Sequence, residues 1–105
     1  QRPWRLIVVD NNSSDNTPEI LRYFCRLLPL VIVSAAKQGK NSALNEALNH
    51  LSPDDNFIIF SDDDAIPDKN YLCVWEKVAS KFLSYDLFAG RVDPYFLARE
   101  PIWLS

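Results

Sequence analysis

Three short apolar runs, separated by helix-like stretches, constrain the fold of this chain more than any other feature. The runs span residues 5–10, 30–35 and 57–61, and they are rich in Val, Ile and Phe. The stretches between them place apolar residues at helical spacing. Strands that alternate with helices form βαβ units with parallel pairing. We therefore predict an α/β fold, with a mostly parallel Rossmann-like sheet and flanking helices.

The first helix has clear start and stop signals. Asp15 or Thr17 is the expected N-cap, Pro18 lies in the first turn, and Pro29 ends the helix. Three further elements are predicted after the second apolar run: a helix at residues 41–50, a helix at residues 67–83 and a strand at residues 86–96. The remaining residues are expected to be irregular.

Composition narrows the class of protein. The chain has 105 residues, of which 48% are hydrophobic and 24% charged, as in an ordinary globular domain. Its net charge of -3 offers no basic surface for nucleic acid. No apolar run approaches the roughly 18 residues that a membrane-spanning helix needs.

The two cysteines bear on the cellular compartment. Cys25 and Cys73 lack the spacing of a metal site and fall in predicted helices, so we expect reduced core thiols. Reduced thiols are typical of the cytosol. We therefore expect a cytoplasmic protein, and the apolar pair Trp103 and Leu104 leaves open a position at the inner face of the membrane.

Carboxylates gather where two predicted strands end. Asp10 ends the first strand, and Asp62, Asp63 and Asp64 follow the third. The carboxyl ends of parallel strands share one edge of a sheet, where ligands bind. Three successive carboxylates repel one another unless a cation or strong donors offset them. Mg²⁺ and Mn²⁺ bind carboxylates and complete their shells with phosphates and water, so a diphosphate-bearing ligand is one interpretation. A solvated acidic turn that caps the next helix is the other.

A cationic position lies near a predicted helix start. Lys40 follows Gly39 there, where exposed N–H groups add to the attraction for an anion, and Lys37 is close by. The spacing of a phosphate-binding P-loop is missing. The single histidine, His50, falls at the end of a helix and is better explained as a dipole partner than as a catalyst.

Together these stretches resemble family-2 glycosyltransferases of the GT-A fold. The motifs "IVVDNNSSDNT", "GKNSALNEAL" and "FSDDDAIPD" occur in the family's order, and "FAGRVDPYFLAREPIWL" resembles a segment of many bacterial members. The resemblance covers nearly the whole chain. It implies a nucleotide-sugar-binding half with a DXD motif, a UDP-sugar donor, and Mn²⁺ or Mg²⁺ as cofactor.

The resemblance also implies roles for individual residues. Asp62 would face the ribose, Asp64 would ligate the metal that bridges the diphosphate, and Lys40 would lie against the base and phosphates. The implied nucleotide-binding residues are Asp10, Asn12, Lys40, Asp62 and Asp63, and the implied metal ligands are Asp64 and Asp62.

Two departures from the family pattern stand out. Members begin with an additional strand that lies between those ending at Asp10 and Asp62, so we expect another chain, a swapped segment or an N-terminal piece to fill its place. Direct pairing of residues 7–9 with 58–60 would contradict this expectation. The catalytic base is expected after Ser105, in an acceptor half. Residues 1–105 are thus expected to be a partial GT-A domain without activity of its own.

The expected function is transfer of a sugar, as a hexosyltransferase that inverts the anomeric centre, to an unidentified glycan, lipid or protein acceptor. A non-catalytic nucleotide- or protein-binding domain is the alternative. A receiver-like phosphoacceptor domain fits less well, because its acidic pair should follow the first strand and not the third.

Overall fold

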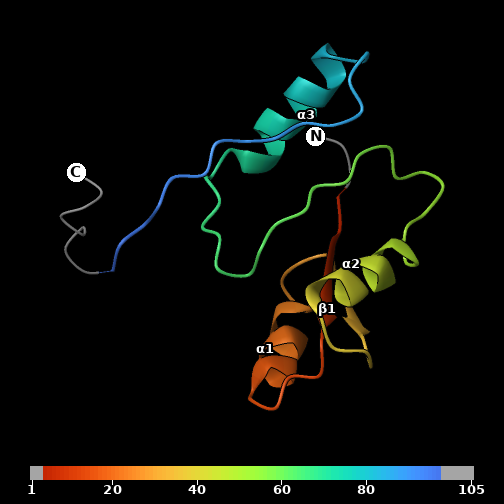
Figure 1. Ribbon diagram of the computed structural model, residues 1–105, viewed down its shortest axis with the longest axis vertical. Helices are drawn as coiled ribbons and strands as arrows, with labels where there is room; N and C mark the ends of the chain where they lie inside the picture. Colours follow the sequence, from red (N-terminus) through yellow and green to blue (C-terminus); the bar gives the residue numbers. More distant parts are fainter. Residues whose placement is uncertain (1–3, 98–105) are drawn as a thin grey trace. The chain divides into compact units, whose positions relative to one another are not determined.

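The computed structural model describes residues 4–97 of the chain, which divides into two compact units, Gln1–Ala65 and Ile66–Ser105. Within residues 4–97, the first unit contains four elements and the second contains one. Figure 1 draws them in the colours of the sequence. In chain order they are β1 (Leu6–Asp10), α1 (Thr17–Phe24), β2 (Leu30–Ser34), α2 (Lys40–Leu48) and α3 (Tyr71–Lys81). The predicted α/β class is confirmed, on a smaller sheet than expected.

A single βαβ unit forms the centre of the first compact unit. β1 and β2 pair in parallel, from Leu6 opposite Leu30 to Asp10 opposite Ser34, and α1 makes the crossover between them. The helix α2 contacts β1. Among the described residues, the buried apolar side chains are Val33 and Ala35, each 6% exposed, so the core is thin.

The first helix begins and ends differently from its prediction. Asn16 occupies the N-cap position, while the Asp15 carboxylate accepts a hydrogen bond from the Thr17 N–H at 3.0 Å just before it. α1 ends at Phe24, five residues before Pro29. The Arg26 N–H bonds to the carbonyl of Tyr23 at 3.2 Å, three residues back, so the helix tightens into 3₁₀-type turns before the proline.

Two predicted strands do not form. Residues 57–61 and 86–96 have no strand structure, and β1 and β2 are the complete sheet of the described residues. A strand needs a hydrogen-bonded neighbour, and these apolar stretches lie next to none within residues 4–97. Residues 7–9 pair with β2 and not with residues 58–60.

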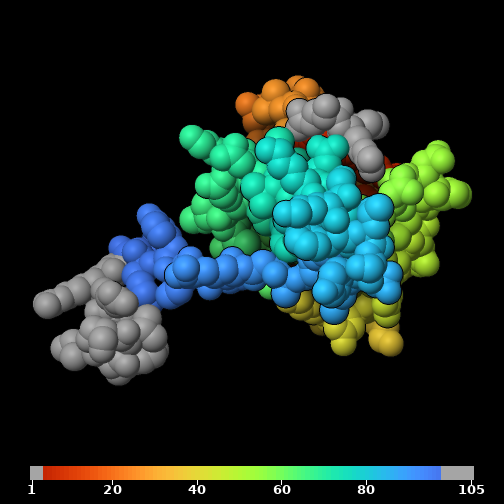
Figure 2. Space-filling view, turned by 90° about the horizontal axis from the view of Figure 1, so that it is seen from above, coloured from red at the N-terminus to blue at the C-terminus, as the bar shows by residue number. Residues whose placement is uncertain are grey.

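The last helix, α3, is shorter than the predicted 67–83. The Asp68 side chain accepts a hydrogen bond from the Asn70 N–H at 2.7 Å, and this turn delays the helix to Tyr71. The segment after α3 runs back along it (Figure 1, Figure 2), and the rings of Trp75 and Phe88 meet edge to face with centroids 6.4 Å apart.

Several other expectations concern exposed or undescribed residues. Cys25 and Cys73 are free, but both are exposed, which corrects the expectation of core thiols. The reason is that the described helices bury none of their side chains completely. Within residues 4–97, no helix combines the length and apolar character needed to cross a bilayer. Trp103 and Leu104 lie outside the described residues.

Candidate functional site

Asp10 ends β1 and holds the loop that follows. Its Oδ1 accepts a hydrogen bond from the Ser13 N–H at 2.9 Å. Hydrogen bonding from the Ser13 side chain and then from its backbone lowers the pKa of Asp10 below the ordinary value of 3.8. The carboxylate is therefore ionised at neutral pH, and it can accept further N–H donors from a ligand.

Asn11 ties the end of β1 to the loop between β2 and α2. Its Nδ2 donates to the carbonyl of Ala35 at 3.2 Å and to that of Lys37 at 2.8 Å. Its Oδ1 accepts the Gly39 N–H at 2.7 Å. Sequence reasoning did not single out this residue. The available signal was an asparagine directly after a buried-type strand, in front of Asn12.

Asn12, one of the predicted nucleotide-binding residues, turns the chain away from β1. Its backbone has φ of 66°, in the left-handed region that asparagine tolerates better than most residues. Its side chain is exposed. The turn lets Asn11 point back toward the β2–α2 loop, while Asn12 faces solvent at the same rim as Asp10.

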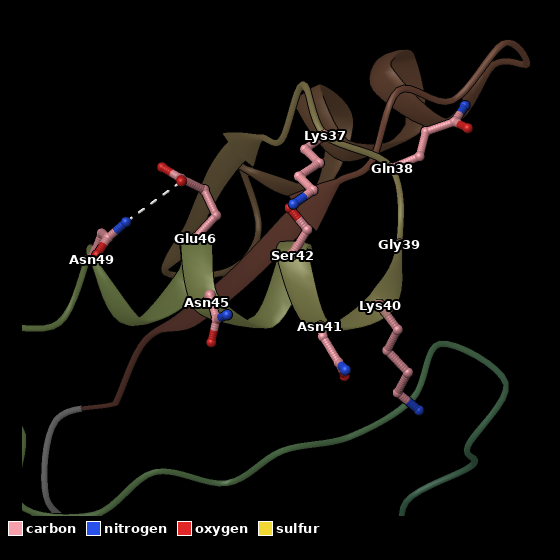
Figure 3. A pocket seen from close by; sticks show the side chains of 9 residues that line it. All are labelled: Lys37, Gln38, Gly39, Lys40, Asn41, Ser42, Asn45, Glu46 and Asn49. Atoms are coloured by element: carbon pink, nitrogen blue, oxygen red, sulfur yellow. Dashed lines mark hydrogen bonds between the residues drawn. The ribbon is translucent and has the colours of Figure 1, made fainter.

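Gly39 and Lys40 open α2. Gly39 has φ of 119° and ψ of 141°, a conformation that strains any residue with a Cβ atom. This places Lys40 as the first helical residue. Its side chain points away from Lys37, toward the chain segment that follows α2 (Figure 3).

The structure brings together two predicted site residues that are far apart in sequence. The Lys40 Nζ lies 2.6 Å from the Asp62 Oδ1, and both side chains are largely exposed, at 67% and 59%. The hydrogen bond to Asp62 and its charge, followed by the charges of Asp64 and Asp63, raise the pKa of Lys40 above 10.5. The two motifs "GKNSALNEAL" and "FSDDDAIPD" thus meet at one ion pair.

The acidic triplet lies in a turn, but it does not cap the next helix, whose N-cap is Asn70. The carbonyl of Asp62 accepts the Ala65 N–H at 3.3 Å, and all three carboxylates are exposed. Within the described part of the chain, no three side chains of His, Cys, Asp or Glu gather into a metal cluster. The triplet therefore does not form a complete cation site by itself.

The donor chemistry of the triplet nevertheless fits a particular kind of cation. Mg²⁺ and Mn²⁺ commonly take one or two protein carboxylates and obtain their other ligands from phosphates and water. Asp62 and Asp64 are suited to share such an ion with a diphosphate, and less suited to hold it alone.

An open hollow of about 540 Å³ lies along α2, beside the ion pair (Figure 3). Besides Gly39, the residues that line it are all of polar or charged type: Lys37, Gln38, Lys40, Asn41, Ser42, Asn45, Glu46 and Asn49. Lys40 is the one predicted site residue in this lining. The sequence signal for the hollow is three asparagines spaced four residues apart, a spacing that places them on one helix face.

His50 lies just beyond the end of α2, as predicted. Its Nε2 is 3.6 Å from the Glu46 carboxylate, one turn earlier, and its carbonyl accepts a hydrogen bond from Arg5 at 2.9 Å. Arg5 also pairs with Asp55. These contacts fasten the loop after α2 to the start of β1. The role they give His50 is structural.

The comparison with known families covers the entire sequence. Residues 1–105 match the family model described as Glycosyl transferase family 2. No curated protein matches the chain, and no solved structure matches it. The βαβ unit with its polar rim is consistent with part of the nucleotide-binding half of a GT-A fold. Because the match extends over the full length, the chain belongs to glycosyl transferase family 2.

Proposed function

We propose that this domain binds a UDP-sugar through a divalent cation, Mn²⁺ or Mg²⁺, for transfer of the sugar to an acceptor. Membership in the family gives the general activity, sugar transfer from a nucleotide-sugar donor. The observation that carries the finer proposal is the 2.6 Å contact between Lys40 and Asp62. This contact supports the proposal because an ammonium group, which attracts phosphates, lies beside a carboxylate, a group that binds Mg²⁺ and Mn²⁺.

The residues of the rim divide between the nucleotide and the cation. Asp10 is ionised and accepts N–H groups of the base, with Asn12 next to it. Asp62 and Asp63 lie toward the ribose. Asp64, together with Asp62, holds the cation.

The cation supplies Lewis acidity to the departing diphosphate. Lys40 neutralises phosphate charge from the first turn of α2, where the helix N-terminus also favours anions. Asn11 keeps Gly39, and with it the backbone of Lys40, in place. No residue of 4–97 is proposed as the catalytic base. We propose that the transfer is of a hexose and inverts the anomeric centre. We also propose that it takes place on the cytoplasmic side, because both cysteines are free.

A thermal-shift titration tests this proposal. UDP, GDP and ADP are each added with Mn²⁺, Mg²⁺ or EDTA, and ligand at about 100 times its Kd should stabilise the fold by roughly 2.7 kcal/mol. We expect UDP with Mn²⁺ to raise the melting temperature, and EDTA or Asp64→Asn to remove the rise. Asp86→Asn, an exposed aspartate of the second unit, is the matched control.

The titration also separates this proposal from the alternative of a non-catalytic binding domain. A rise with UDP that persists in EDTA and in Asp64→Asn would contradict the cation's role. The absence of any rise with all three nucleotides, in protein shown to be folded by circular dichroism, would contradict nucleotide binding itself.

A further inference from the structure

The ion pair between Lys40 and Asp62 has a consequence for the order in which ligands bind. Asp62 is one of the two carboxylates proposed for the cation, and its Oδ1 is occupied by the Lys40 ammonium at 2.6 Å. A divalent cation at the same oxygen would lie within a few ångström of this ammonium. Two positive charges so close repel each other, so the cation and the Lys40 ammonium compete for Asp62.

The surrounding charges explain why Lys40 rests on the acidic triplet. Asp62 acts on its ammonium most strongly, and Asp64 and Asp63 attract it as well. Three adjacent carboxylates repel one another, and one lysine offsets part of this repulsion. In the free protein Lys40 thus offsets part of the carboxylate repulsion that a divalent cation would otherwise offset.

The backbone of Lys40 is fixed, whereas its side chain is free to move. The Asn11 side chain holds Gly39 at 2.7 Å, and Lys40 is the first residue of α2. Its side chain is 67% exposed, and its ammonium sits on a flexible four-carbon stem. An exposed ion pair of this kind is weak. The ammonium can therefore exchange one anionic partner for another without a change in the fold.

We propose that Lys40 is an internal stand-in for the divalent cation: it occupies Asp62 in the free protein and releases it when the diphosphate offers a replacement partner. This inference rests on the proposed function. It predicts that the cation binds weakly alone and more tightly with the nucleotide, because the diphosphate takes over Lys40 as the cation takes over Asp62. The two ligands are then coupled, and by linkage each strengthens the other's binding.

A titration of the full chain with Mn²⁺ alone tests this inference. Electron paramagnetic resonance measures the concentration of free Mn²⁺ at each step. Lys40→Met removes the competing ammonium, and we expect it to bind Mn²⁺ roughly two- to five-fold more tightly than the unaltered chain. Addition of UDP should then improve Mn²⁺ affinity less in Lys40→Met than in the unaltered chain.

Two further variants separate competition from a general change of charge. Lys37→Met removes a positive charge from the same loop and should leave Mn²⁺ affinity unchanged, because the Lys37 ammonium makes no ion pair with any residue of 4–97. Lys40→Arg keeps a cation in place and should behave as the unaltered chain. Unchanged or weaker Mn²⁺ binding by Lys40→Met, or an equal gain in Lys37→Met, would overturn the inference.

Asp64→Asn distinguishes this inference from the proposed function. If Asp64→Asn and UDP both leave Mn²⁺ binding unchanged, the proposed cation and nucleotide site is wrong, and the inference falls with it. If both alter Mn²⁺ binding but Lys40→Met does not, the site stands and only the role of Lys40 is refuted.

Discussion

The side-chain amide of Asn11 accepts the Gly39 N–H at 2.7 Å and so joins the end of β1 to the start of α2. With its two donated bonds to Ala35 and Lys37, it makes three contacts to one loop. Lys40 follows directly, and Lys40 contacts Asp62. Three motifs of the chain are therefore connected through side chains at one rim of the sheet.

Asn11→Ala should destabilise the first compact unit, because it removes all three hydrogen bonds of this side chain. Net contributions of about 0.5–1.5 kcal/mol for each bond, reduced by solvent exposure, give an expected loss of about 1–3 kcal/mol in the free energy of unfolding. Urea denaturation followed by circular dichroism measures it. Asn45→Ala, at an exposed position of α2, is the control and should change stability by less than about 0.5 kcal/mol. Equal losses in the two variants would contradict the role of Asn11.

Gly39→Ala should lower the free energy of unfolding of the first compact unit through the backbone alone. A Cβ atom at Gly39 would meet nothing within 4 Å, so the expected cost is conformational. Because Gly39 has φ of 119° and ψ of 141°, we expect alanine to lower the free energy of unfolding by about 1–3 kcal/mol. Urea denaturation measures this loss.

Gly39→Asn sharpens this test. Asparagine tolerates the left-handed region near ψ of about 45°, but Gly39 lies outside it, so asparagine should not restore stability. Full rescue by asparagine would show that the loop adopts another conformation in solution.

The first part of the fold was predictable because its signals are local. The apolar runs at 5–10 and 30–35 became β1 and β2, and the helix between them provides the long crossover connection that parallel pairing needs. Residues 57–61 are similarly apolar but pair with no strand within residues 4–97, and composition cannot supply a partner.

In the site, too, residues with local signals were predictable and contacts between distant segments were not. Lys40 and Asp62 were each singled out by charge and position, but their contact depends on how two loops fold, 22 positions apart along the chain. Asn11 was missed because its partners are carbonyl and N–H groups that lie 24 to 28 residues away. Almost every residue carries the same backbone N–H and carbonyl groups, so a sequence does not show which of them a side chain will bind.

Acid should destabilise the chain through Asp55. Hydrogen bonds from the Ser52 N–H and then from Arg5 lower its pKa in the folded state below the ordinary value of 3.8. A lowered folded pKa gives stability that is present above the unfolded pKa and is lost as the pH falls through the folded value. The free energy of unfolding should therefore fall as the pH drops below about 4.

Asp55→Asn checks this assignment, because an amide at this position cannot titrate. We expect a lower stability at neutral pH and a shallower decline in acid than in the unaltered chain, measured by urea denaturation between pH 7 and 3. Asp86→Asn is the control and should leave the slope unchanged. An unaltered slope in Asp55→Asn would assign the acid sensitivity to other groups, of which Asp10 and Asp15 are next, since their pKa values are also lowered.

Asp10→Asn should weaken binding of the nucleotide without affecting that of the cation, if Asp10 accepts N–H groups of the base. Replacing a carboxylate acceptor by an amide costs a hydrogen bond to a charged group, about 1.5–3 kcal/mol, or roughly a ten- to hundred-fold loss in UDP affinity with Mn²⁺ present. Calorimetry measures the UDP affinity, and the Mn²⁺ titration without nucleotide should be unchanged. Asp15→Asn is a matched control, because Asp15 also uses its carboxylate to hold a turn, through the Thr17 N–H at 3.0 Å. Equal losses in the two variants would show that the loop's shape, and not an Asp10 contact, governs UDP binding.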